Sequence, residues 1–186
     1  MTHPTLQQSH GAEFTRIYSY GAARGDLIVP NDDLVGPINS SDEWIQQRTG
    51  IITRTRASHD VLAIDLATDA AREAVERSGI AADKVDLVII ATISNVRQTP
   101  SMAAVVADRI GANPAAAYDT NAACAGFSYA VTQADALIRS GAAHYAVVVG
   151  AEKLSDVVDP TDRSISFLLG DGAGAVVIGP SETPGI

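Results

Sequence analysis

Two short, almost uninterrupted apolar runs constrain the fold of this chain more than any other feature. They are Asp86–Thr92 (DLVIIAT) and Tyr145–Gly150 (YAVVVG). A β-strand that is covered by helices on both faces has this pattern, because neither of its faces meets water. Segments with helical periodicity precede and separate the two runs. The sequence therefore predicts an α/β fold.

Three longer segments are predicted helices. Val61–Ser78 has a stripe of alanine and aliphatic residues opposite charged ones, and Gly79 is a suitable stop. Met102–Ile110 follows a proline, and Phe127–Ile138 carries apolar residues at helical spacing. Further strands are predicted at Phe14–Tyr20 and Ala115–Thr120, with an edge strand at Ala175–Gly179. This order predicts a mixed, mainly parallel sheet with right-handed crossovers and helices on both faces.

A short helix is predicted around the single tryptophan. Ser40 and Glu43 have the spacing of a capping box, which predicts a helix that ends near Gly50. Trp44 lies four residues before Arg48 and therefore on the same helical face. An aromatic ring beside a guanidinium suits a purine or a phosphate-bearing ligand, but purely structural stacking on a helix surface is the stronger interpretation of these facts alone.

Arg54 and Arg56 extend this basic region. In a chain with net charge −9, such a concentration of arginine forms either a solvated face or a surface that attracts phosphates. The residues alone leave both alternatives open.

The only cysteine lies in a run of small residues, Asn121–Phe127 (NAACAGF), at a predicted strand-to-helix turn. In the first turn of a helix, the thiol of Cys124 would face unpaired backbone N–H groups and the positive end of the helix dipole, which favour the thiolate. A nucleophile is one interpretation. A buried, inert cysteine that packs as a small hydrophobic residue is the other.

Composition excludes several classes of function. The acidic net charge argues against nucleic acid as a main partner. One cysteine excludes an internal disulfide and a Cys-based zinc site, and no histidine pair suggests a metal. Met1–Gly11 is polar and unlike a secretory signal, and no stretch approaches a membrane span. A soluble cytoplasmic protein without a metal is therefore expected.

Several motifs together resemble the β-ketoacyl-acyl-carrier-protein synthase III family. In chain order they are Ser41–Ile45 (SDEWI), Arg48–Ile51 (RTGI), Ala122–Phe127 (AACAGF), Asp159–Arg163 (DPTDR) and Gly170–Ala175 (GDGAGA). The resemblance extends from about Phe14 to Ile186. Because the motifs occur in the family's order, they are a far more specific signal than any one alone.

The resemblance implies a thiolase-like fold, in which two similar halves pack into five αβαβα layers. Residues 14–186 would be the N-terminal half, and residues 1–13 a flexible tail. The family is longer than this chain. Its C-terminal half would be absent here, together with the catalytic histidine and asparagine, the second oxyanion donor and the docking patch for acyl carrier protein. The chain is therefore expected to need that half as a partner.

The resemblance also implies a reaction. The family transfers an acyl group from coenzyme A to the cysteine, here Cys124, and condenses it with malonyl-acyl carrier protein, which loses carbon dioxide and initiates fatty acid synthesis. The coenzyme A thioester would be a substrate, and no cofactor is expected. A relative that primes polyketide or signal-molecule synthesis is an alternative. A non-catalytic module that binds coenzyme A or acyl chains is another.

Further site residues follow from the resemblance alone. Trp44 would stack on the adenine of coenzyme A, with Arg163 beside the same ring and with Arg48 and Thr49 at the phosphate or polar edges. The acyl pocket would be lined by Leu154 and Leu169, and by Thr99 reaching across the interface of a homodimer. A threonine at position 99 leaves room for primers longer than acetyl.

Overall fold

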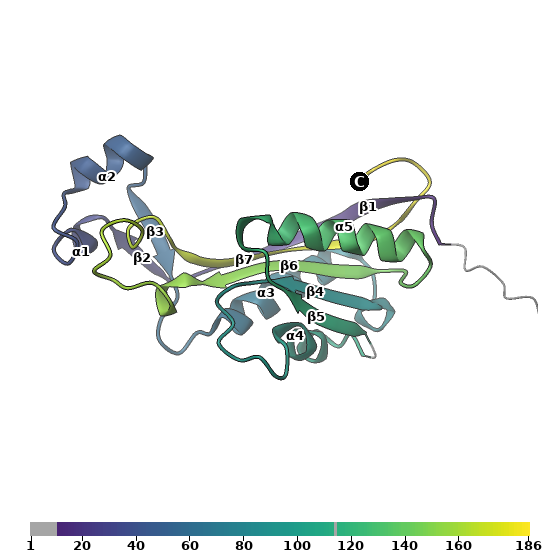
Figure 1. The fold of residues 1–186 in the computed structure, drawn as a ribbon. Coiled ribbons are helices and arrows are strands. Elements are labelled where there is room, and N and C mark those ends of the chain that lie inside the picture. The colour runs from purple at the N-terminus through teal and green to yellow at the C-terminus, as the bar shows by residue number, and fades with distance from the viewer. Residues whose placement is uncertain (1–10, 114) are drawn as a thin grey trace, which may run out of the picture.

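Strands and helices alternate along most of the chain (Figure 1). The computed structural model describes residues 11–113 and 115–186. Its elements are β1 (Phe14–Arg24), β2 (Leu27–Pro30), α1 (Asp32–Val35), α2 (Asp42–Thr49), β3 (Thr53–Arg56), α3 (Ala63–Ser78), η1 (Ala82–Lys84), β4 (Leu87–Ala91), α4 (Met102–Ile110), β5 (Ala116–Thr120), η2 (Ala123–Ala125), α5 (Gly126–Arg139), β6 (Ala146–Lys153), η3 (Leu154–Asp156) and β7 (Asp171–Ser181), where η marks a 3-10 helix. The predicted α/β class, with helices on both faces of a mixed sheet, is confirmed.

The main sheet has five strands in the order β1-β7-β6-β4-β5. β4 pairs in parallel with β5 and with β6, whereas β7 runs antiparallel to both β6 and β1. The parallel neighbours are joined through α4 and α5, as such pairs require. The carboxyl ends of β4, β5 and β6 therefore meet at one edge of the sheet, which we call the carboxyl edge.

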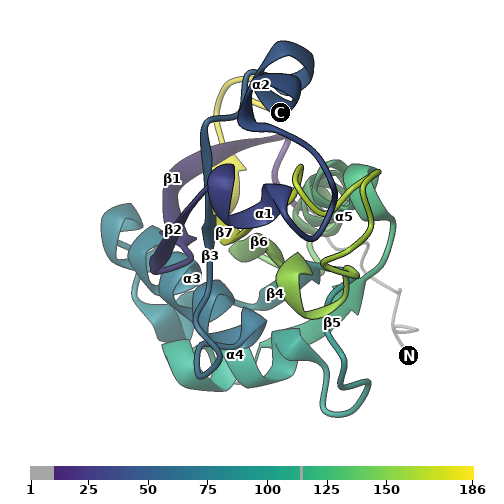
Figure 2. The same ribbon diagram turned by 90° about the vertical axis from the view of Figure 1, so that its left-hand side faces the viewer.

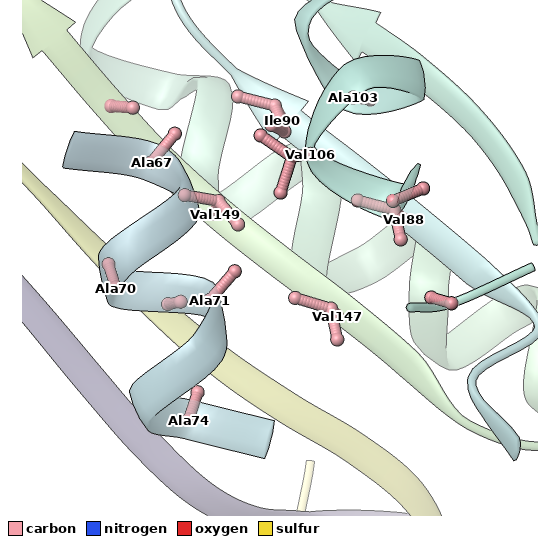
Figure 3. Close-up of a cluster of buried hydrophobic side chains, with 14 of the residues drawn as sticks. Ala67, Ala70, Ala71, Ala74, Val88, Ile90, Ala103, Val106, Val147 and Val149 are labelled. Atoms are coloured by element: carbon pink, nitrogen blue, oxygen red, sulfur yellow. The ribbon is translucent and has the colours of Figure 1, made fainter. Parts of the chain in front are cut away.

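Alternate residues of the central strands enter two separate cores. Val88 and Ile90 of β4 face α3 and α4, whereas Ile89 faces α5. Figure 3 shows the first core, in which the small side chains of α3 lie over Val147 and Val149 of β6. These side chains are Ala67, Ala70, Ala71 and Ala74, all fully buried. Because alanine adds little bulk, the α3 backbone can lie close to the sheet. The apolar runs of β4 and β6 are thus nearly continuous because helices cover both faces of the sheet, as the sequence predicts.

A small lobe extends beyond the carboxyl edge of the sheet, and Figure 2 looks onto this end of the molecule. We call it the hairpin lobe, residues 25–57. It consists of the antiparallel pair β2–β3 with α1 and α2. Its core contains Leu34, Ile38 and Ile45, and Phe167 completes it from the loop between β6 and β7. Two segments far apart in the sequence therefore fold as one body.

Two sequence predictions about secondary structure are wrong in detail, and two strands are missed. The last strand is not an edge strand confined to Ala175–Gly179. β7 begins at Asp171 and lies between β1 and β6. Asp171–Gly174, which precede the predicted strand and lead into it, are thus part of β7. The N-cap of α2 is Ser41, whose hydroxyl accepts from the Trp44 N–H, and not Ser40. Finally, β2 and β3 were not predicted.

Most of the predicted tail, residues 1–10, lies outside the described residues. Next to it, the Ala12 N–H donates to the Ile138 carbonyl at the end of α5. Among the described residues, no helix is both long and apolar enough to span a bilayer.

Candidate active site

The single cysteine lies at the carboxyl edge of the sheet, on the 3-10 turn Ala123–Ala125 between β5 and α5. It is exposed, so the interpretation of Cys124 as a buried structural residue is excluded. The turn is strained, because Ala123 has a φ of 44°, a left-handed conformation that residues with a side chain rarely adopt. Such strain costs roughly 1–3 kcal/mol and is typical of functional turns that present a nucleophile. The thiol lies just before the first turn of α5 and not within it.

Close packing seats this turn on the sheet. A Cβ atom added to Gly126, the first residue of α5, would lie 3.0 Å from the Ala91 Cβ at the end of β4. A Cβ added to Gly150 of β6 would lie 3.4 Å from the Phe127 ring. Each contact pairs a glycine with a neighbouring element. The small residues around the cysteine therefore fix the start of α5 directly over the carboxyl edge.

Two carboxylates hold the loop between β4 and α4, residues 92–101. Glu152 of β6 accepts from the N–H groups of Ile93 (2.9 Å) and Ser94 (3.1 Å), and also from the Ser94 hydroxyl. Asp119 of β5 accepts from the N–H groups of Met102 and Ala103 at the start of α4, both at 2.8 Å. The loop is thus fixed at both ends by strands that border the cysteine turn.

We expect Asp119→Asn to lower the free energy of unfolding by about 1–3 kcal/mol, because one buried backbone N–H at the start of α4 would lose its charged acceptor. Urea denaturation measures the loss. The matched control is Asp83→Asn, which removes an exposed carboxylate from η1. Equal effects of the two substitutions would contradict the assigned role.

Two guanidinium groups lie near the Trp44 ring, one on α2 and one on the loop between β6 and β7. The Arg48 guanidinium carbon lies 4.1 Å from the centre of the Trp44 ring, and that of Arg163 lies 5.2 Å from it. The Phe167 ring contacts the indole edge-on, with centroids 5.4 Å apart. We call Trp44, Arg48 and Arg163 the tryptophan clamp. The fourth predicted residue, Thr49, uses its hydroxyl internally, donating to the Ile45 carbonyl and accepting from the Ile51 N–H.

The loop that carries Arg163 is shaped by two short turns. Asp159 accepts from the hydroxyl and N–H of Thr161, and Asp162 accepts from the same groups of Ser164. These hydrogen bonds hold the pKa of each carboxyl below its usual value. Both aspartates are therefore ionised at neutral pH, and Arg163 is the middle residue of the second turn, between Asp162 and Ser164.

Arg54 joins the hairpin lobe to this loop. Its side chain is buried and donates to the carbonyls of Val29 (3.1 Å) and Phe167 (3.0 Å) and to the Asn31 side chain. Desolvation, followed by the charge of Arg56, lowers the Arg54 pKa. The side-chain amide of Asn31 in turn donates to Asp42, and hydrogen bonds from Gln46 and Asn31 lower the pKa of that carboxyl. Arg54 is thus a structural residue and does not belong to a solvated basic face.

The predicted acyl-pocket residues are only partly brought together. Leu154 and Leu169 line one cavity beside η3. Thr99 is exposed on the loop between β4 and α4 and does not line that cavity. Among the described residues, no group of three or more His, Cys, Asp or Glu side chains could hold a metal ion.

Sequence reasoning missed Asp119 and Glu152, and it did not reveal the structural role of Arg54. A charged residue at the end of an otherwise apolar strand was the only signal for the two acids. Their partners are 16 to 60 residues away along the chain, so the sequence contained no spacing that could reveal them.

The chain is similar to known proteins of one family. The family model for 3-oxoacyl-[acyl-carrier-protein (ACP)] synthase III matches residues 118–186, which include the cysteine turn. Beta-ketoacyl-[acyl-carrier-protein] synthase III from Kocuria rhizophila is 58% identical over 182 residues, which are 98% of this chain and 51% of that protein. The same-named protein of Tropheryma whipplei is 51% identical over 93% of this chain and 54% of its own length.

Solved structures of similar proteins superpose closely on this chain, again over about half of their own length. The priming β-ketosynthase from the R1128 polyketide pathway superposes with a TM-score of 0.94 at 39% identity, covering 98% of this chain and 55% of that one. 3-Oxoacyl-[acyl-carrier-protein] synthase III from Aquifex aeolicus gives 0.87 at 42% identity, with 91% and 55% covered. The chain spans about half the length of the curated relatives it matches.

Proposed function

We propose, because the chain belongs to the β-ketoacyl-[acyl-carrier-protein] synthase III family, that it carries the acyl-accepting half of a condensing enzyme that initiates fatty acid synthesis. The observation that carries this proposal is the exposed thiol of Cys124 on a strained turn at the carboxyl edge of the sheet. Ligand sites of α/β folds lie outside the carboxyl ends of strands. The hairpin lobe, whose helix α2 carries Trp44 and Arg48, extends from the same edge (Figure 1).

In the first step, the Cys124 sulfur attacks the carbonyl carbon of an acyl-coenzyme A. The bond between that carbon and the coenzyme A sulfur breaks, and coenzyme A leaves as a thiol with the proton that Cys124 gives up. A backbone N–H of the cysteine turn is suited to stabilise the oxyanion. In the second step, malonyl-acyl carrier protein loses carbon dioxide and its carbon displaces Cys124 from the acyl group. The residues for that step would come from the part of the relatives that this chain does not cover.

The tryptophan clamp is the proposed site for the nucleotide end of coenzyme A. A purine that stacks between Trp44 and Arg163 needs about 3.5–4.0 Å on each face. The present 5.2 Å separation is too short for both layers, so Arg163 would move outward. Arg48, whose guanidinium carbon lies 4.1 Å from the ring centre, offers a cation for a phosphate. Coenzyme A enters this scheme as a substrate.

Three expectations stay predictions: that the protein forms a homodimer, that malonyl-acyl carrier protein is the acceptor, and that the protein is cytoplasmic. The exposed position of Thr99 is compatible with its reaching a second copy.

The test is to incubate the chain with a labelled acyl-coenzyme A, alone and with the remaining half supplied. We expect a mass increase equal to one acyl group, located on the peptide that contains Cys124. No adduct under either condition would overturn the proposal.

A second candidate is a relative that primes polyketide synthesis, favoured by the likeness to the R1128 priming β-ketosynthase. Both candidates share the acyl-cysteine step and differ in the acceptor. Competition between different malonyl-carrier proteins for the acylated chain distinguishes them.

A further inference from the structure

A small cavity of about 50 Å³ lies between the end of β3, η3 and the residues that lead into β7. One part of its wall is apolar and consists of Leu154, Val158, Pro160 and Leu169. The other part is polar and consists of Arg56, Ser155 and Ser166. The cavity therefore has the two-sided character of a site for an amphipathic group.

Two polar groups in this wall lack partners. The Ser166 side chain is only 2% exposed, and its hydroxyl has no hydrogen-bond partner among the described residues. The same is true of the Nε–H of Arg56, which is also buried. The one hydrogen bond of the Arg56 guanidinium within the described chain goes from Nη2 to the Ser166 carbonyl, at 2.9 Å. Buried polar groups are normally paired, so two unpaired donors in one cavity indicate that water or a ligand binds there.

The charges around the cavity favour an anion. No carboxylate of the described residues lies within 4.0 Å of the Arg56 guanidinium, and its charged neighbour Arg54 is also a cation. The buried carboxylate of Asp171 lies next to Ser155, but three donors already bind it: the N–H and hydroxyl of Ser155 and the N–H of Ala57. The positive charge of Arg56 is thus left without a counterpart.

We propose that this cavity binds the carboxylate end of a short aliphatic chain, with Arg56 and Ser166 as donors to the carboxylate and the leucines against the chain. An arginine side chain offers donors in a geometry that suits a carboxylate. One water molecule needs roughly 10–15 Å³ of such space, so the cavity has room for a larger group. For the proposed function, such a cavity would favour acyl-coenzyme A substrates whose acyl chain ends in a carboxylate. That last step alone rests on the proposed function.

The experiment uses butyrate as the probe and butyramide as its uncharged counterpart, with sodium chloride keeping ionic strength constant. The NMR signal of the Arg56 Nε–H reports binding to the chain directly and needs no acyl transfer. We expect butyrate to shift this signal saturably and butyramide to bind at least about 10-fold more weakly, since a charge-assisted bond is lost. Binding is also measured with Arg56→Met and Ser166→Ala, and with the matched control Arg72→Met on the exposed face of α3.

We expect both cavity variants to weaken butyrate binding about 10-fold or more, and Arg72→Met to leave it unchanged. Equal binding of butyrate and butyramide, or no saturable shift, would mean that the cavity holds water only and would overturn the proposal. If Arg56→Met fails to fold, the comparison of the two probes on the unaltered chain and the Ser166→Ala variant still decide. A failure of acyl transfer to Cys124 leaves this outcome untouched, so the two proposals fail separately.

Discussion

Replacing Cys124 by alanine is expected to abolish acyl transfer to the chain without changing its affinity for coenzyme A. The chain contains no second thiol, so no other side chain offers the same nucleophile. Alanine also fits the turn, since both neighbouring residues are alanines. Intact-mass analysis measures the adduct, and calorimetry measures binding of coenzyme A.

Trp44→Ala provides the converse control. Stacking of a base on an aromatic ring contributes about 1–3 kcal/mol, so we expect coenzyme A to bind about 5- to 150-fold more weakly. The thiol should still accept an acyl group from a short thioester that lacks the nucleotide, such as an N-acetylcysteamine thioester. This pair of variants separates chemistry from binding.

The pair also distinguishes an enzyme from a binding module. A non-catalytic module that binds coenzyme A would lose affinity with Trp44→Ala, yet the unaltered chain would form no adduct. An adduct that persists in Cys124→Ala would place the acyl group on another residue and contradict the role of the cysteine. Each outcome thus points to one interpretation.

The central sheet and its helices could be predicted because their patterns are local. β4 and β6 are continuous apolar runs, and α3 and α5 have apolar faces at helical spacing. The start of β7 was missed for a physical reason. Asp171 reads as a turn residue, yet it is buried in a strand because donors on two other segments, Ala57 and Ser155, bind its carboxylate.

The hairpin lobe was harder to predict. β3 has the sequence Thr-Arg-Thr-Arg, which lacks the apolar alternation of a half-buried strand. Its stability depends on Arg54, whose acceptors lie 23, 25 and 113 residues away along the chain. For the site, the cysteine turn follows from short-range sequence, whereas the carboxylates of Asp119 and Glu152 act through backbone groups that only the fold brings near.

Replacing Arg54 by methionine is expected to lower the free energy of unfolding by about 3 kcal/mol or more and to disrupt the tryptophan clamp. Methionine has a similar length but no donors. The carbonyls of Val29 and Phe167 and the Asn31 side chain would lose a charged partner in a buried position. Each such hydrogen bond contributes about 1.5–3 kcal/mol.

In Arg54→Met, the hairpin lobe should unfold before the main sheet does, because Arg54 joins this lobe to the loop that carries Phe167 and Arg163. Trp44 is the only tryptophan in the chain and contacts both of these side chains, so its fluorescence reports the state of the clamp. In urea, the fluorescence of Arg54→Met should change at a lower concentration than the far-UV circular dichroism of the sheet and helices.

Two further variants make the interpretation specific. Arg54→Lys keeps the charge but not the planar group that reaches three acceptors, so we expect an intermediate loss of stability. Arg72→Met removes an exposed arginine from α3 and should have little effect. If Trp44 fluorescence and circular dichroism changed together in Arg54→Met, at the urea concentration seen for the unaltered chain, Arg54 would not be what joins the hairpin lobe to the loop that carries Phe167. Coenzyme A affinity would then survive the substitution, whereas a displaced clamp predicts that it falls in parallel with the fluorescence change.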